Sequence, residues 1–105
     1  MNPAVIRTPE AMRDLRELAD YIACDNFDAA VRFLDAAGAT FRFLAESPDV
    51  GNQCSFSSPR AAGLLRWRIK GFERYLIFYR RAQHGIEVVR IIHSARNLDA
   101  IFENE

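Results

Sequence analysis

The chain contains 105 residues, of which 50% are apolar and 27% charged, and its 14 Lys and Arg are balanced by 14 Asp and Glu. A chain of this length buries enough surface for one hydrophobic core but not for a second lobe or a large cofactor cavity, which predicts a single domain over residues 1–105. The length excludes doubly wound dinucleotide-binding enzymes and (β/α)₈ barrels, and the apolar fraction excludes a disordered chain.

The balanced total charge hides an asymmetry along the chain. Residues 1–50 contain five Arg and nine Asp or Glu, a net charge of −4, whereas residues 51–105 contain nine Lys or Arg and five Asp or Glu, a net charge of +4. All nine basic residues of the second half fall between Arg60 and Arg96. This half favours an acidic partner or phosphate groups, because Arg offers a planar fork that suits carboxylates and phosphates.

The two cysteines and the apolar pattern indicate the compartment. Cys24 and Cys54 have no metal-type spacing, and two thiols do not make a disulfide framework in a chain that can build its own core. No apolar run approaches the ~20 residues that a membrane span requires, and no signal-peptide pattern opens the sequence. We therefore expect a soluble cytoplasmic protein that does not enter a membrane.

The first quarter of the chain predicts a short strand, residues 2–7, followed by an amphipathic helix. Thr8 is predicted to cap this helix, because its side chain can accept a hydrogen bond from a free backbone N–H group. Pro9 at the first helical position and Glu10 in the first turn also favour a helix start here. Apolar residues then recur at helical spacing at Met12, Leu15, Leu18, Ala19 and Ile22.

A second helix is predicted directly after the first, with Asn26 as its cap and Ser47-Pro48 at its end. So short a link predicts an antiparallel helical hairpin. Phe33 and Phe43 lie outside the predicted apolar stripe, which indicates that something covers part of the outer surface of the hairpin. The predicted stripe consists of Ala30, Leu34, Ala37, Phe41, Leu44 and Ala45.

The apolar pattern changes from helical to alternating in the second half of the chain. Residues 48–63 contain two Pro and two Gly and are predicted to form an irregular loop. Three strands of an antiparallel meander are predicted over residues 64–69, 75–80 and 86–93, with turns at residues 71–74 and 82–85. Ser94 or Asn97 is then expected to cap a short C-terminal helix. The order β-α-α-β-β-β-α indicates an α+β domain with a helical hairpin packed on a small, mainly antiparallel sheet.

The first strand of the meander combines cations with one large aromatic residue. Its alternation places Arg66 and Arg68 on one face, together with Lys70, and Trp67 on the other. Cations at strand spacing suit an acidic partner or phosphates, although such a face is usually just solvated. Trp67 is interpreted either as a core residue or as a contact residue for a partner.

No motif for metal, nucleotide or acyl-transfer chemistry occurs in the sequence, so no metal and no cofactor are predicted. Metal-free RNA cleavage would need groups that transfer protons and cations that stabilise the phosphorane charge. Glu87, His93 and Tyr79 could transfer protons, but His93 at a strand end is more simply a structural hydrogen-bonding residue, and Tyr79 a core residue. The candidate cations are Arg66, Arg68, Arg80, Arg81, Arg90 and Arg96.

Four segments in order resemble the ParE branch of the RelE/ParE superfamily of type II toxins. The helices contribute AMRDLRELADYIACDN and AAVRFLDAAGATFRFLAESPDVG. The strands contribute YLIFYR and GIEVVRIIHSARNL. The resemblance covers essentially the whole chain and implies a RelE/ParE-like β-α-α-β-β-β core. It also implies a cytoplasmic toxin without enzymatic activity that inhibits DNA gyrase, causes growth arrest and is neutralised by a ParD-like antitoxin. No sequence-specific DNA binding is expected of the toxin alone.

The RelE branch, which cleaves messenger RNA on the ribosome, is the alternative. In that case His93, Tyr79, Arg81 and Arg90 are the candidate catalytic residues. The final Asp of the family pattern is replaced by Asn97, His93 has no neighbouring Tyr, and the isoelectric point of 6.7 suits a ribosome binder poorly. These features favour the ParE branch. A further alternative is an inactive member of the fold that only binds a partner.

An antitoxin that folds on binding would cover apolar surface of the toxin and meet its basic half with acidic side chains. We expect Arg66, Arg68, Arg81 and Arg96 to form the electrostatic part of this contact. The apolar part of the predicted antitoxin surface is Phe33, Phe43 and Trp67.

Overall fold

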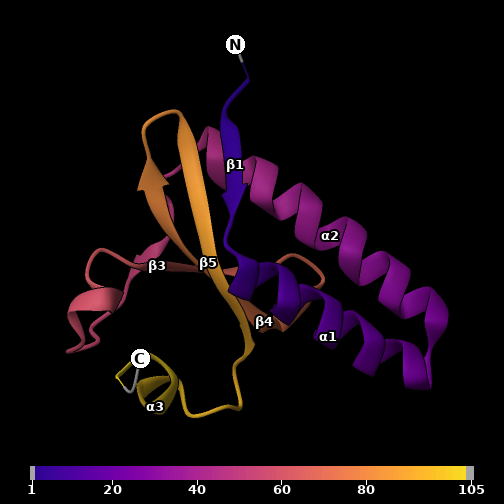
Figure 1. Ribbon diagram of the computed structural model, residues 1–105. Coiled ribbons are helices and arrows are strands. Elements are labelled where there is room, and N and C mark those ends of the chain that lie inside the picture. The colour runs from indigo at the N-terminus through magenta and orange to yellow at the C-terminus, as the bar shows by residue number, and fades with distance from the viewer. Residues whose placement is uncertain (1, 104–105) are drawn as a thin grey trace.

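Strands from both ends of the chain meet in one sheet in the computed structural model, which describes residues 2–103 (Figure 1). Residues 1 and 104–105, the ends of the predicted domain, lie outside the described residues. The elements in chain order are β1 (Ala4–Arg7), α1 (Pro9–Asp25), α2 (Phe27–Glu46), β2 (Asn52–Gln53), a 3₁₀ turn (Pro59–Ala61), β3 (Leu65–Ile69), β4 (Phe72–Ala82), β5 (Gly85–His93) and α3 (Leu98–Glu103).

The sheet has five strands in the order β1-β5-β4-β3-β2. β1 runs parallel to β5, with Val5 opposite Ile86, and the other neighbours are antiparallel. Figure 1 shows α1 and α2 side by side on one face of this sheet, with α3 apart from them. The predicted α+β class, with a helical hairpin on a mainly antiparallel sheet, is confirmed. No helix among residues 2–103 is long and apolar enough to span a membrane.

Side-chain caps begin the helices where the local sequence predicts them. The Thr8 hydroxyl accepts a hydrogen bond from the Ala11 N–H at 3.0 Å, and Asn26 Oδ1 accepts one from the Ala29 N–H at 3.0 Å. Of the two candidates for the third cap, Asn97 is the one used, because its Oδ1 accepts the Ala100 N–H at 3.1 Å. These bonds satisfy N–H groups that the first helical turn leaves without partners.

The main core lies between the hairpin and the sheet, and it corrects the predicted stripe of α2. Phe33 is 0% exposed and packs edge-on against Phe72 and Tyr75, at ring-centroid distances of 5.4 and 5.0 Å. Leu34, a residue of the predicted stripe, is 43% exposed. The prediction that Phe33 is an outer-surface residue is therefore wrong. α2 packs on the strands as well as on α1, which turns its buried face by one position toward Phe33.

A second, smaller core covers the opposite face of the sheet. Phe102 of α3 packs against Phe78 of β4 and Phe56 of the long connection, at centroid distances of 4.7 and 4.6 Å. The predicted irregular loop over residues 48–63 is therefore partly ordered, since it contains β2 and the 3₁₀ turn. The predicted turn at residues 71–74 is also too long, because β4 already begins at Phe72.

Candidate partner-binding site

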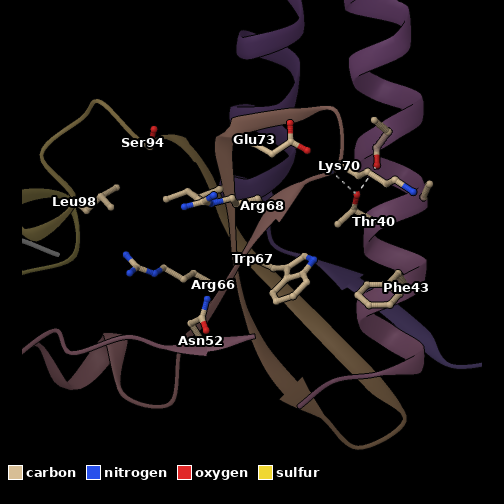
Figure 2. A pocket seen from close by; sticks show the side chains of 13 residues that line it. Thr40, Phe43, Asn52, Arg66, Trp67, Arg68, Lys70, Glu73, Ser94 and Leu98 are labelled. Carbon is tan, nitrogen blue, oxygen red and sulfur yellow. Dashed lines mark hydrogen bonds between the residues drawn. The ribbon is translucent and has the colours of Figure 1, made fainter. Parts of the chain in front are cut away.

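A groove of about 1050 Å³ runs between α2 and the free part of β3 (Figure 2). β2 pairs with β3 only at Leu65 and Arg66. From Trp67 onward, no other strand among the described residues pairs with this edge of β3. The helix wall of the groove is formed by Ala36, Ala39, Thr40 and Phe43, and the strand wall by Arg66, Trp67, Arg68 and Lys70.

The two faces of β3 give the groove two chemical characters. In Figure 2 the Arg66 and Arg68 side chains extend toward Leu98, whereas Trp67 points toward Phe43 on α2. The Trp67 and Phe43 rings lie 6.1 Å apart, and neither residue is fully buried. One wall is therefore aromatic and the other cationic, which suits an amphipathic acidic partner better than a small ligand.

Small residues on α2 keep the groove open. Ala36, Ala39, Thr40 and Phe43 follow one another at i, i+3, i+4 and i+7, which places them on one face of the helix. The buried Thr40 hydroxyl donates to the Ala36 carbonyl at 2.7 Å and accepts the Lys70 N–H at 3.5 Å. This face joins α2 to the turn after β3 while leaving space beside Trp67.

Tyr79 fixes the end of the groove near β2. Its side chain is buried, its hydroxyl donates to the Pro48 carbonyl at 2.9 Å, and it accepts the Gly51 N–H at 2.9 Å. Burial raises the pKa of Tyr79 above its usual value, and the Gly51 hydrogen bond opposes that rise. The segment that leads into β2 is thereby held on the hydroxyl of a core tyrosine.

The family model described as "ParE toxin of type II toxin-antitoxin system, parDE" matches residues 5–98. The chain belongs to the ParE toxin family. Among solved structures it is similar to a chain described as "Chromosomal ParDE TA system from P. aeruginosa". That match has a TM-score of 0.62 and 17% identity and covers 88% of this chain and 96% of the other, so it supports the shared fold. No curated protein sequence matches the chain. The predicted membership of the ParE branch is confirmed.

The groups predicted for an RNA-cleaving site are engaged elsewhere in this ParE-family chain. His93 Nδ1 accepts the Ala95 N–H at 3.0 Å. Its ring packs edge-on against Tyr75 at 5.0 Å, so the expectation that His93 has no neighbouring Tyr is wrong. Tyr79 belongs to the core under the hairpin, whereas Phe78 beside it faces the other core. Arg90 is opposite Phe78 in the sheet, so Tyr79 and Arg90 lie on different faces.

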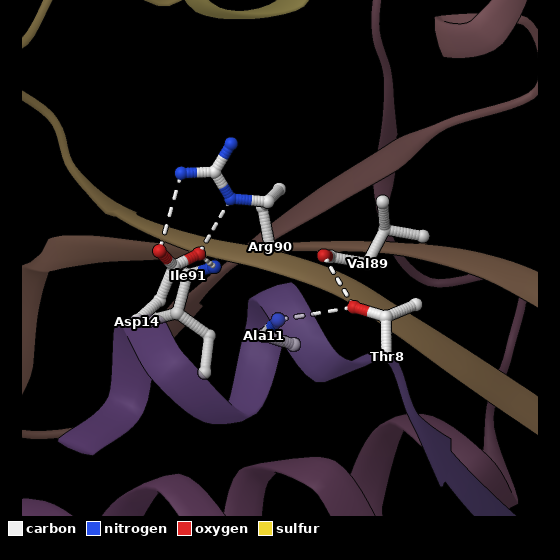
Figure 3. A network of polar contacts seen from close by, with 6 residues as sticks. All are labelled: Thr8, Ala11, Asp14, Val89, Arg90 and Ile91. Atoms are coloured by element: carbon white, nitrogen blue, oxygen red, sulfur yellow. Dashed lines mark hydrogen bonds and ion pairs between the residues drawn. The ribbon is translucent and has the colours of Figure 1, made fainter.

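The two predicted catalytic arginines are bound to carboxylates. Arg90 donates to both Asp14 oxygens, at 2.6 and 3.1 Å, and the Ile91 N–H donates to the same carboxylate at 3.0 Å (Figure 3). Arg81 pairs with Asp49, in a separate hollow of about 470 Å³. Tyr79 and Arg81 lie two residues apart on β4, but His93 is opposite Tyr75 and Arg90 opposite Phe78, so the four RelE-like candidates do not form one site.

Four of the predicted partner-binding residues of this ParE-family toxin line the groove: Phe43, Arg66, Trp67 and Arg68. Phe33 is in the core, Arg81 lies in the second hollow, and Arg96 is exposed in the turn after β5. The sequence analysis missed the helix wall. Its signal was present in the small residues Ala36 and Ala39, placed seven and four positions before Phe43 on the same helix face.

Proposed function

We propose that this type II toxin inhibits DNA gyrase and is neutralised by a ParD-like antitoxin that binds the groove between α2 and β3. The family match supports the toxin role, and the similar solved structure belongs to a ParDE system. The gyrase target and the ParD-like partner go beyond those likenesses. The positions of the RNA-cleavage candidates support a target that is bound rather than cleaved, and the groove supports the partner.

The observation that carries the non-enzymatic reading is the separation of the RNA-cleavage candidates. Cleavage needs a base, an acid and cations around one phosphate. Here His93 accepts a backbone hydrogen bond, and the buried Tyr79 hydroxyl is held by Pro48 and Gly51. Arg90 is held by Asp14, and the sheet face on which it lies is filled by the aromatic cluster around Phe78. This separation supports a toxin that acts by binding its target.

The groove supports an acidic protein partner. Trp67 and Phe43 offer aromatic surface that a partner can cover, and aromatic residues of this kind dominate binding energies at interfaces. Arg66 and Arg68 are exposed on the adjacent face, where they attract acidic side chains and speed association. A ParD-like antitoxin with an acidic, apolar toxin-binding segment fits both walls.

The test compares two target assays on the same purified toxin. The proposal expects loss of gyrase supercoiling, or trapped gyrase–DNA cleavage complexes, and no ribosome-dependent cleavage of messenger RNA. Added antitoxin should restore gyrase activity. Messenger RNA cleavage that is abolished by His93→Ala would overturn the proposal in favour of the RelE-like function. Expression in cells without growth arrest would instead indicate an inactive, partner-binding member of the fold.

A further inference from the structure

The end of the helical hairpin where α1 passes into α2 projects away from the sheet (Figure 1). Asn26 alone joins the two helices. Its N–H donates to the Ile22 carbonyl at 2.9 Å, and its Oδ1 accepts the Ala29 N–H at 3.0 Å. Between Ile22 and Phe33, no residue belongs to the main core. This tip of the hairpin, residues 17–35, is therefore held by backbone hydrogen bonds while much of its surface remains free.

The tip exposes large apolar side chains that the fold does not use. Tyr21 is 75% exposed and Phe27 68% exposed, which makes them the two most exposed large apolar residues among residues 2–103. Val31 and Leu34 are also exposed, and they follow Phe27 at i+4 and i+7 on the same side of α2. Single exposed apolar side chains are common, but four at one end of a hairpin indicate a contact surface.

The tip also carries the whole net charge of the first half of the chain. Residues 17–35 contain five acidic residues and one Arg, a net charge of −4, so the rest of residues 1–50 is balanced. All five carboxylates are exposed, and none forms an ion pair within residues 2–103. They belong to Glu17, Asp20, Asp25, Asp28 and Asp35. The exposed aromatic side chains therefore stand in a region of net negative charge.

This charge distinguishes among the partners that the apolar surface could bind. The proposed antitoxin segment is acidic, and like charges oppose its binding at the tip. A second copy of the toxin would bring one acidic tip against another in a two-fold dimer, with the same penalty. A basic surface fits the tip. An enzyme that acts on DNA presents such a surface, because it neutralises phosphates with Lys and Arg.

We propose that the toxin contacts DNA gyrase through the hairpin tip, where Tyr21 and Phe27 pack against a basic, DNA-contacting surface of the enzyme. This inference rests on the proposed function, since it names the surface that acts on the proposed target. The aromatic side chains supply the apolar contact, and the carboxylates around them attract the basic surface. The short link at Asn26 holds both helices in place, which reduces the entropy lost on binding.

The tip and the groove lie on the same helix but differ in charge. Phe27 precedes the groove residue Ala36 by nine positions, or about 14 Å of helix. An antitoxin bound in the groove would stand beside the tip and obstruct an enzyme as large as gyrase. Substitutions at the tip should therefore change gyrase inhibition without changing antitoxin affinity.

The aromatic contact is tested with Tyr21→Ala/Phe27→Ala. Ile6→Ala/Met12→Ala is the control, because Ile6 and Met12 are also exposed but lie outside the tip. The toxin concentration that halves gyrase supercoiling should rise at least about tenfold for the tip variant and less than about threefold for the control. Affinity for a purified ParD-like antitoxin should stay within about threefold of wild type in both. Thermal unfolding checks that both variants fold.

The electrostatic contact is tested with Asp20→Lys/Asp25→Lys. Glu46→Lys/Asp99→Lys makes the same change in net charge at exposed positions outside the tip. At low salt, association with immobilised gyrase should slow at least about tenfold for the tip variant and less than about threefold for the control. The difference should shrink at high salt, because exposed charges are then screened.

Cys24 is an exposed thiol within the tip and reports contact without any substitution. Its alkylation by iodoacetamide, read by mass spectrometry, should slow at least about threefold when gyrase is bound, because the reaction requires an accessible thiol. Unchanged labelling of Cys24 in the gyrase complex would contradict the inference.

The remaining outcomes separate this surface from the proposed target. Tip variants that inhibit gyrase as strongly as the wild type would overturn the inference and leave the target intact. Loss of antitoxin affinity in these variants would assign the tip to the antitoxin, and a toxin dimer that they dissociate would assign it to a second copy. Either result overturns the proposal. A wild-type toxin that does not inhibit gyrase would remove the proposed function, and this surface with it.

Discussion

The two edges of the sheet are completed in different ways. β5 continues past the end of β1, and side chains of the α1 segment occupy the part that β1 leaves open. The Thr8 hydroxyl donates to the Val89 carbonyl at 2.8 Å, and the Asp14 carboxylate accepts the Ile91 N–H at 3.0 Å (Figure 3). Thr8 also caps α1, so one residue closes the strand and starts the helix.

β3 likewise continues past the end of β2, but no strand among residues 2–103 pairs with it on that side at Arg68. α2 runs beside this edge and presents the small, apolar side chains of Ala36 and Ala39, which have no hydrogen-bonding group to offer the strand. The comparison indicates that the side chains of the neighbouring helix decide whether a sheet edge in this fold is hydrogen-bonded or open. The hydrogen bonds at the β5 edge stabilise the fold, whereas the β3 edge is the one we propose for recognition.

The largest expected effect on stability distinguishes a core residue of α2 from a groove residue of the same helix. Phe33→Ala should lower the free energy of unfolding by about 4 kcal/mol, because it leaves a cavity beside Phe72 and Tyr75. Phe43→Ala, ten positions further along the same helix, should lower it by less than about 1 kcal/mol, since this residue is 45% exposed. Urea unfolding measures both. Antitoxin affinity should fall about tenfold for Phe43→Ala. Similar stability losses in the two variants would contradict the division.

Asp14→Ala tests the β5 edge, where the Asp14 carboxylate accepts a hydrogen bond from the strand. This change removes the carboxylate from the Arg90 guanidinium and the acceptor from the Ile91 N–H, in a pair whose side chains are only 12% and 15% exposed. We expect a loss of about 3 kcal/mol in unfolding free energy. Asp20→Ala on the exposed face of α1 removes the same charge and is the matched control, with an expected change within about 0.5 kcal/mol. Equal effects of the two substitutions would show that the closed edge does not depend on Asp14.

Much of the fold is predictable because its signals are local. Thr8 and Asn26 are capping residues at the right spacing, and the alternation around Trp67 predicts which β3 side chains share a face. The buried face of α2 is not local, because α1 and the strands together decide whether Phe33 or Leu34 turns inward. The Asp14–Arg90 pair joins residues 76 positions apart and has no pattern in the sequence.

The candidate site was predicted in part for the same reason. Arg66, Arg68 and Trp67 stand in one alternating strand, so their sequence signal is strong. The hollow beside them depends on Ala36 and Ala39 and on the path of residues 48–51. That path is set by the Tyr79 hydroxyl, which is distant in sequence. A groove is the space between several elements, so no single residue in the sequence indicates it.

A smaller effect on stability is expected at Tyr79, whose hydroxyl holds the segment before β2 away from the exposed edge of β3. Tyr79→Phe removes two hydrogen bonds and should cost about 1–2 kcal/mol at pH 7. Burial raises the pKa of Tyr79, so the folded state holds this proton more tightly than the unfolded state, in which the pKa is about 10. The stability that Tyr79 contributes should therefore be present below pH ~10 and decline as the pH rises through its folded pKa. The wild-type protein should lose more stability than Tyr79→Phe across that alkaline range. Parallel pH profiles would contradict this reading.

The most direct test of the open edge compares two double charge reversals by titration calorimetry with a purified ParD-like antitoxin. Arg66→Glu/Arg68→Glu changes the groove, and Arg13→Glu/Arg16→Glu on the exposed face of α1 makes the same change in net charge outside it. At physiological salt the groove variant should bind at least about 100-fold more weakly, whereas the control should change by less than about threefold, because distant charges are screened. Both proteins should unfold near the wild-type temperature. Equal losses of affinity, or none in the groove variant, would contradict the assignment of recognition to the β3 edge.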